Sequence, residues 1–266
     1  MSVALRIALH RDPDVALGTI ATASTALLVA LVAVAAEAPA RGLHLGSAWP
    51  FLLAGLLSPG AAQILVTVAI RDAGSSRVSM VFGTAPLVSV TIALIFLGEP
   101  ASAPLLMGSV LVVAGGVELA RERERPAHLN RLGLVYAFAG VTLFAIRDNL
   151  VRHLAGGGIA VPPAVAAAAA LLGGIALIAP WARVRAGRRW LPFVPVGLLF
   201  GGSYVALFEA YYRGRVTVVA PLVAVESLVG VGLSVLLLRD SELVGRRLLF
   251  GAALIVAGGA LIGATR

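Results

Sequence analysis

Few ionisable side chains lie inside the apolar stretches of this sequence, and Glu226 lies nearest the centre of one. On a helix it shares a face with Val219, Val223 and Gly230, and Pro221 is close by. A charged side chain in hydrocarbon costs about 2.5–3.5 kcal/mol on insertion scales, which makes each such residue a functional candidate. We expect Glu226 to bind a proton or a cationic group. The alternative is a neutral Glu that hydrogen-bonds a neighbouring helix.

Two further charged positions lie near the ends of apolar stretches. Glu209 is four residues before Arg213, which favours an i,i+4 ion pair over a role in a substrate pathway. Asp148 is expected to pair with Arg152 at i,i+4, because adjacent residues on a helix do not face each other. That pairing would leave Arg147 free to meet Glu209 or an anionic ligand.

Uncharged polar side chains add further candidates for a substrate site. Gln63, Tyr204 and Tyr211 lie within apolar stretches, and Gln63 stands at nearly the same height as Val205 in the second half of the sequence. The segment Gly201-Gly202-Ser203 could form a bendable point beside a cavity, although close helix packing explains it equally simply.

Several kinds of catalytic site are excluded by the residue inventory. The four His residues lie in loops or at the ends of apolar stretches, without the HExxH spacing of metalloproteases. No Gly-x-Ser-x-Gly elbow occurs, and a nucleotide-binding loop ending in Lys cannot form because the sequence has no lysine. With no cysteine either, we predict no metal, no cofactor and no enzymatic activity.

The elements that position these residues are predicted to be membrane-spanning helices. The sequence is 59% hydrophobic and 13% charged, whereas soluble domains are about 25% charged. A bilayer-spanning helix needs roughly 20 apolar residues, and barrel strands would alternate in polarity, which these stretches do not. We predict an all-α integral membrane protein with nine helices, at about 16–36, 49–70, 78–97, 104–120, 132–151, 160–181, 190–212, 217–238 and 247–264.

The charges indicate membrane topology and argue against nucleic acid. All 21 basic residues are arginines, and they lie in short loops without interleaved aromatic residues. The apolar run up to Ala36 is longer than that of a signal peptide, so we expect a retained segment. With residues 1–12 inside, 15 arginines lie inside and the C-terminus lies outside. The remaining six, predicted outside, are Arg41, Arg147, Arg152, Arg213, Arg215 and Arg266.

The sequence contains two copies of one unit, offset by about 141 residues. Ala4-Leu5-Arg6 matches Ala145-Ile146-Arg147, and the run 111–116 matches 254–259. We predict repeats at 1–120 and 132–266, joined by a basic linker at 121–131. The first copy is expected to lack the start of its first helix. An odd number of spans per copy would place the two copies in opposite orientations across the membrane.

These motifs resemble the drug/metabolite transporter superfamily, specifically its EamA-type members with five plus five helices. The resemblance rests on a helix from Pro86 to Gly98-Glu99-Pro100, followed by the Gly-rich run 108–116. The second copy has Val225-Glu226-Ser227 and Arg239-Asp240 where the family pattern has Pro and Gly-Glu. The resemblance implies a multi-pass protein of the cell membrane with both ends in the cytoplasm, in contrast to the charge count.

The function implied is export or exchange of a small metabolite or drug-like molecule by alternating access. An ion gradient, coupled through a proton or another ion, or the substrate's own gradient would drive it. We expect the site near mid-membrane, walled by the helices at 78–97, 132–151, 190–212 and 217–238. The alternatives are a membrane enzyme or lipid-handling protein, and a non-transporting assembly subunit. Gly259 and Gly263 form a GxxxG motif, so a homodimer is a further expectation.

Overall fold

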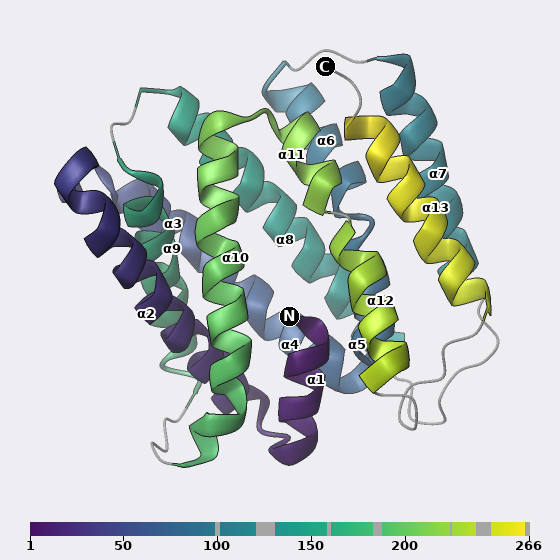
Figure 1. Cartoon of the computed structure of the whole chain (residues 1–266), viewed down its shortest axis with the longest axis horizontal. Helices are drawn as coiled ribbons and strands as arrows, with labels where there is room; N and C mark the ends of the chain where they lie inside the picture. Colours follow the sequence, from purple (N-terminus) through teal and green to yellow (C-terminus); the bar gives the residue numbers. More distant parts are fainter. Residues whose placement is uncertain are drawn as a thin grey trace.

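The computed structural model of the chain is a bundle of helices, with no strand in the part that it describes. It describes residues 1–98, 102–120, 131–158, 161–182, 188–223, 225–237 and 246–263 (Figure 1). The helices are α1 (Ser2–Arg11), α2 (Val15–Arg41), η1 (Leu45–Ser47), α3 (Trp49–Gly55), η2 (Leu56–Ala61), α4 (Ala62–Ala73), α5 (Ser75–Phe82), α6 (Ala85–Phe96), α7 (Ala103–Ala120), α8 (Arg131–Gly156), α9 (Pro163–Ile178), η3 (Arg188–Phe193), α10 (Val194–Arg213), α11 (Val216–Val223), α12 (Val225–Leu237) and α13 (Arg246–Gly263).

Each of the nine predicted stretches corresponds to a helix or to a pair of helices in line. Five continuous or kinked segments are long and apolar enough to cross a bilayer, and shorter apolar helices lie at Ala103–Gly115, Pro163–Ile178 and Leu249–Ile262. The remaining stretch is formed by α11 and α12. The prediction of a multi-pass helical membrane protein is therefore confirmed.

The outward faces of the helices are apolar, as a lipid environment requires. Val32 on α2 is 71% exposed and Val110 on α7 is 68% exposed, and large apolar side chains are exposed on most of the other spans as well. A soluble protein rarely exposes such continuous apolar surface. In a bilayer these side chains contact lipid and carry no penalty.

Helix interruptions occur where proline or local geometry removes regular hydrogen bonds. Between α3 and α4, Ser58 has extended backbone angles and precedes Pro59, which has no N–H to donate. The carbonyl oxygen of Ser58 accepts a hydrogen bond from Tyr204 Oη at 2.9 Å. A partner from α10 thus satisfies a carbonyl group that the interruption exposes in the bundle interior.

The two repeats are inverted, because equivalent helices α7 and α13 run antiparallel. Gly108 lies against Gly258, and a methyl group on Gly258 would lie 2.5 Å from the carbonyl oxygen of Gly108. A methyl group on Gly115 would lie 2.6 Å from the carbonyl oxygen of Gly251. The sequence repeat pairs position 108 with 251 and 115 with 258, so each contact is the two-fold image of the other.

Other contacts follow the same two-fold pattern. Helix α2 packs on α10, as its counterpart α9 packs on α3 and η2. Helix α5 packs on α12, as α11 packs on α6 (Figure 1). Helix α1, which aligns with the second half of α8, contacts α10 as α8 contacts α4. The predicted linker lies outside the described residues except for Arg131, which begins α8.

Candidate functional site

A cavity of about 450 Å³ lies between the two repeats. Its walls come from α5, α6, α8, α10, α11 and α12, together with Met1 at the start of the chain. Most of the lining is apolar or aromatic, with a few polar groups, as in small-molecule sites generally. The lining residues are Met1, Phe82, Ala85, Phe144, Arg147, Asp148, Phe200, Ser203, Tyr204, Ala206, Leu207, Ala210, Val219, Val223 and Glu226.

Arg147 lies in the wall of this cavity within a cage of aromatic rings. Its side chain comes from α8 and the residue is 1% exposed. The guanidinium carbon lies 4.7 Å from the ring centre of Tyr204, 5.4 Å from that of Phe144 and 5.6 Å from that of Phe208. Cation–π attraction of this kind is strongest when the charge is removed from water. The rings therefore hold a buried cation at the edge of the cavity.

Asp148 is the carboxylate closest to this cation. Arg147 Nε lies 3.0 Å from Asp148 Oδ1, but neither atom makes a hydrogen bond of good geometry, because neighbouring helix residues diverge. Tyr211 Oη donates to Asp148 Oδ2 at 2.9 Å. The site thus contains an Arg147–Asp148 charge pair, and Tyr211 of α10 holds the Asp148 carboxylate in place.

The predicted pairing of Asp148 with Arg152 is wrong. Arg152 instead donates from Nη1 to the carbonyl oxygens of Tyr211, at 3.2 Å, and Tyr212, at 3.4 Å. These carbonyls belong to the last turn of α10 and have no partner within their own helix. Helix C-termini attract cations, and Arg152 lies close enough to interact with the C-terminus of α10.

Glu226 projects from α12 toward the cavity and is exposed to it. It also borders a smaller cavity of about 230 Å³ between α1, α10 and α12. Among the described residues no hydrogen bond or ion pair to Glu226 is present. A carboxylate in this position is available to a ligand.

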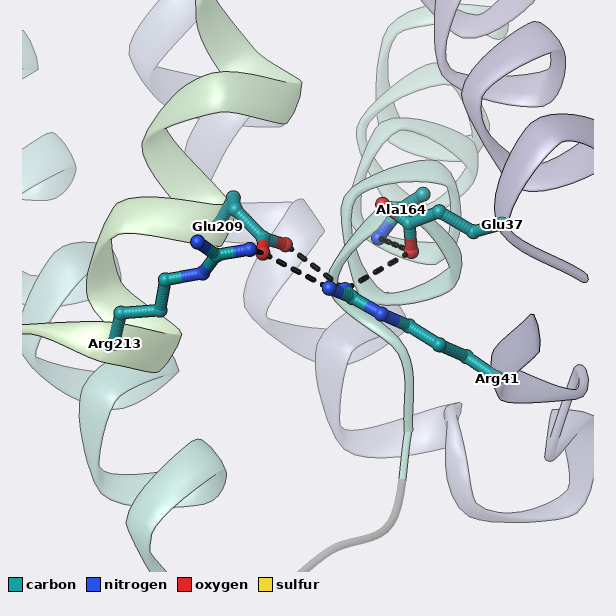
Figure 2. A network of polar contacts seen from close by, with 5 residues as sticks. All are labelled: Glu37, Arg41, Ala164, Glu209 and Arg213. Atoms are coloured by element: carbon teal, nitrogen blue, oxygen red, sulfur yellow. Dashed lines mark hydrogen bonds and ion pairs between the residues drawn. The ribbon is translucent and has the colours of Figure 1, made fainter.

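Glu209 lies outside the cavity, in a surface network at one end of the bundle. It pairs with Arg213, as predicted, and also with Arg41 Nη1 at 3.1 Å (Figure 2). Arg41 also approaches Glu37 at 3.5 Å, and Glu37 accepts a hydrogen bond from the backbone N–H of Ala164. Figure 2 shows that this network joins α2, α9 and α10. Arg147 does not contact Glu209, so that alternative is not found.

The other polar candidates differ in whether they line the cavity. Tyr204 lines the cavity, whereas Tyr211 stands behind it and holds Asp148. Gln63 on α4 is fully buried outside the cavity lining, and neither of its side-chain polar atoms has a partner. Ser203 lines the cavity beside Tyr204.

Sequence analysis missed the aromatic cage, although a spacing signal was present. Phe200, Tyr204 and Phe208 recur every four residues and therefore stack along one face of α10. Adjacent ring centres lie 5.3 and 4.9 Å apart. Such a stripe is usually core packing, and only the position of Arg147 against it indicates a site. Within the described part of the chain, no group of three His or carboxylate residues could hold a metal.

Family comparison identifies the architecture. The EamA-like transporter family matches residues 1–118 and 131–264, which is nearly the whole chain in two domains. The chain belongs to the EamA-like transporter family. This family is a family of transporters and not of enzymes. Membership therefore implies transport of a small molecule across a membrane.

Structural comparison shows that a solved structure has the same fold. A solved structure described only as "Crystal structure of protein" superposes with a TM-score of 0.72 and covers 99% of this chain and 94% of its own. The two sequences are 21% identical, so the likeness concerns the fold alone. No curated protein matches the sequence significantly.

Proposed function

We propose that this protein is a secondary transporter of the cell membrane that moves a small molecule through the central cavity by alternating access. The supporting observation is the position of the cavity between two inverted repeats, with both charged and aromatic groups in its wall. Inverted repeats provide two related arrangements in which one site faces opposite sides of the membrane. Export or exchange is the proposed direction.

The residues have distinct proposed roles. Arg147 and Tyr204 contact the substrate, and Tyr211 positions Asp148 beside Arg147. Glu226 exchanges a proton or a cationic group, which would couple transport to an ion gradient. Glu209 is assigned to the surface network that joins helices, because it lies outside the cavity. Gln63 is a buried polar group on α4 with no proposed contact to substrate.

Cysteine labelling tests alternating access directly, because the chain has no cysteine of its own. Ser203→Cys places a thiol in the cavity wall. In proteoliposomes, a membrane-impermeant maleimide should label this thiol from both sides of the membrane. Labelling from one side under every condition would contradict alternating access and favour a non-transporting assembly subunit.

A matched control is available one residue away. Gly202 is exposed and does not line the cavity, and an added Cβ would meet no atom within 4 Å. Gly202→Cys should face lipid and stay unlabelled by the same polar reagent, because a thiolate does not form in hydrocarbon. Equal labelling of the two variants would show that the reagent does not report on the cavity.

A further inference from the structure

A further cavity, of about 320 Å³, lies at one end of the bundle. It forms where the last turns of α8, the end of α6 and the residue before α11 meet. Helices α6 and α11 pack side by side at this end (Figure 1). Among the described residues, none lines both this cavity and the central one. The lining residues are Leu97, Arg152, His153, Gly156, Gly157 and Arg215.

The polar side chains of this end cavity are basic. Arg152, His153 and Arg215 line it, and no carboxylate is among its described lining residues. Arg152 donates from Nη1 to the carbonyl oxygens that end α10, and this contact fixes its guanidinium beside the cavity. Neither Arg152 nor Arg215 forms an ion pair with a carboxylate of the described residues. The cavity therefore concentrates positive charge and offers hydrogen-bond donors to an anion.

The two-fold repeat does not account for the exposure of Arg215. Its counterpart in the first repeat is Arg77, because Arg77-Val78 aligns with Arg215-Val216. Arg77 is 1% exposed, whereas Arg215 is exposed and lines the end cavity. The same position of the repeat is thus packed inside the bundle in one copy and is available to a ligand in the other.

Exposed apolar side chains continue from the end cavity along α6. Ile95 is 69% exposed and Phe96 is 78% exposed, and both come directly before Leu97 of the lining. The cavity lies at the ends of the spans, where lipid headgroups lie, and the apolar side chains of α6 lie toward the acyl chains. A molecule with a phosphate group and an apolar tail matches both surfaces, because guanidinium groups pair well with phosphate oxygens.

We propose that the end cavity binds the phosphate group of an anionic membrane lipid, whose acyl chains lie along Ile95 and Phe96. Arg152 and Arg215 bind the phosphate oxygens, as basic pockets between membrane helices bind anionic headgroups. A zwitterionic lipid fits less well, because no carboxylate among the described lining residues can pair with its ammonium group. The site is separate from the central cavity, so this inference goes beyond the proposed function and does not depend on it.

A cysteine in the end cavity reports on its occupancy, because the chain has no cysteine of its own. Gly156→Cys is suitable, since an added Cβ at this lining residue meets no atom within 4 Å. A neutral, polar maleimide modifies the thiol in nanodiscs of phosphatidylcholine, alone or mixed with phosphatidylglycerol. We expect phosphatidylglycerol to slow the reaction at least about fivefold, roughly the factor that one arginine contributes at an anionic surface. An equal rate in both kinds of nanodisc would overturn the proposal.

Second substitutions in Gly156→Cys separate a site from general surface charge. Arg215→Gln should abolish the protection by phosphatidylglycerol, and Arg215→Lys should retain part of it. Arg213→Gln is the matched control, because it removes the same charge two residues away and outside the cavity lining. Melting curves in phosphatidylcholine nanodiscs check that each variant is folded. Protection that persists in folded Arg215→Gln, or that is lost equally in Arg213→Gln, would contradict the proposal.

Soluble phosphates distinguish a lipid site from a site for a free anion. Inorganic phosphate and glycerol 3-phosphate carry the charge of the headgroup without acyl chains. We expect neither to protect Gly156→Cys at millimolar concentration in phosphatidylcholine nanodiscs. Protection by either one as strong as that by phosphatidylglycerol would show a site for soluble phosphates and would overturn the assignment to a lipid.

Discussion

At the scale of single residues, Glu226 offers a test of ion coupling. It shares the cavity with Arg147 and Asp148, and its carboxylate is exposed to the ligand space. Glu226→Gln keeps the size of the side chain and removes its charge. If Glu226 exchanges a proton during transport, the variant should fold normally and lose the pH dependence of uptake into proteoliposomes.

The contrary outcome is equally clear. Transport in Glu226→Gln with wild-type rate and pH profile would show that Glu226 serves packing alone.

Asp12 gives a pH prediction outside the spans. It joins the α1–α2 connection to η3 through Arg189, with an Nε–Oδ2 distance of 2.7 Å. Hydrogen bonding from Arg189 holds the pKa of Asp12 below its usual value of 3.8, despite an opposing effect of burial. A lowered pKa in the folded state means that this stabilisation is present above pH 3.8 and is lost as pH falls through the lowered value.

We therefore expect the melting temperature of the wild type to decrease more at acidic pH than that of Asp12→Asn, which has no carboxylate at this position to protonate. The effect should be small, because Arg189 is half exposed and its ion pair is screened by water. Melting curves of both proteins from neutral pH down to pH about 3 check this. Parallel curves at every pH would show that the ion pair contributes nothing.

Sequence reasoning located some of these residues and misplaced others for a physical reason. Glu226, Arg147 and Tyr204 were found because polarity within an apolar stretch is conspicuous. Glu209 and Gln63 satisfy the same criterion but lie outside the cavity, since polarity does not give the rotational phase of a helix against its neighbours. The Asp148–Arg152 prediction failed because a local i,i+4 rule ignores the carbonyl groups of a helix distant in sequence.

At the scale of elements, the crossing of α7 and α13 depends on glycine. An added methyl group on Gly115 would overlap the carbonyl oxygen of Gly251, which belongs to backbone and cannot rotate away. Gly115→Ala should lower stability by about 1–3 kcal/mol, the usual cost of overpacking. Unfolding of the purified variant in detergent measures it, with Gly232→Ala as a control because its added Cβ meets no atom within 4 Å. Equal stability of both variants would contradict the tight crossing.

A second prediction concerns Arg6 and Arg152, two arginine clamps that each hydrogen-bond the carbonyl groups at the end of a helix. Arg6 holds the end of α4, and Arg152 holds the end of the equivalent α10. Because the repeats are inverted, these ends lie on opposite faces of the membrane. If each clamp closes its own face, Arg6→Gln and Arg152→Gln should speed labelling of Ser203→Cys from opposite sides. Faster labelling from the same side in both variants would contradict gating by the clamps.

At the scale of the whole molecule, nine spans separate the α1–α2 connection from the C-terminus. The charge count places the arginine-rich loops in the cytoplasm and the C-terminus outside. A reporter active only in the cytoplasm should therefore work when inserted at 121–130 and fail when fused after Arg266. Activity at both positions would show that the family's usual topology, with both ends in the cytoplasm, holds here.

The whole architecture was more predictable than its details. Nine apolar stretches and a repeat of about 141 residues determine the span order and the inversion, because hydrocarbon allows few alternatives. The cavity was predictable only as a region between spans. Its volume and the aromatic cage around Arg147 depend on side-chain packing between helices that are distant in sequence.

The two-fold related glycine contacts of α7 and α13 also constrain which substitutions the sequence can accept. Gly108 and Gly258 meet at one contact, so separating the helices for the first substitution removes most of the cost of the second. The double variant Gly108→Ala/Gly258→Ala should therefore lose less stability than the sum of the losses of the two single variants, as coupled neighbours do. Over evolutionary time the two positions should covary, although they lie in different repeats.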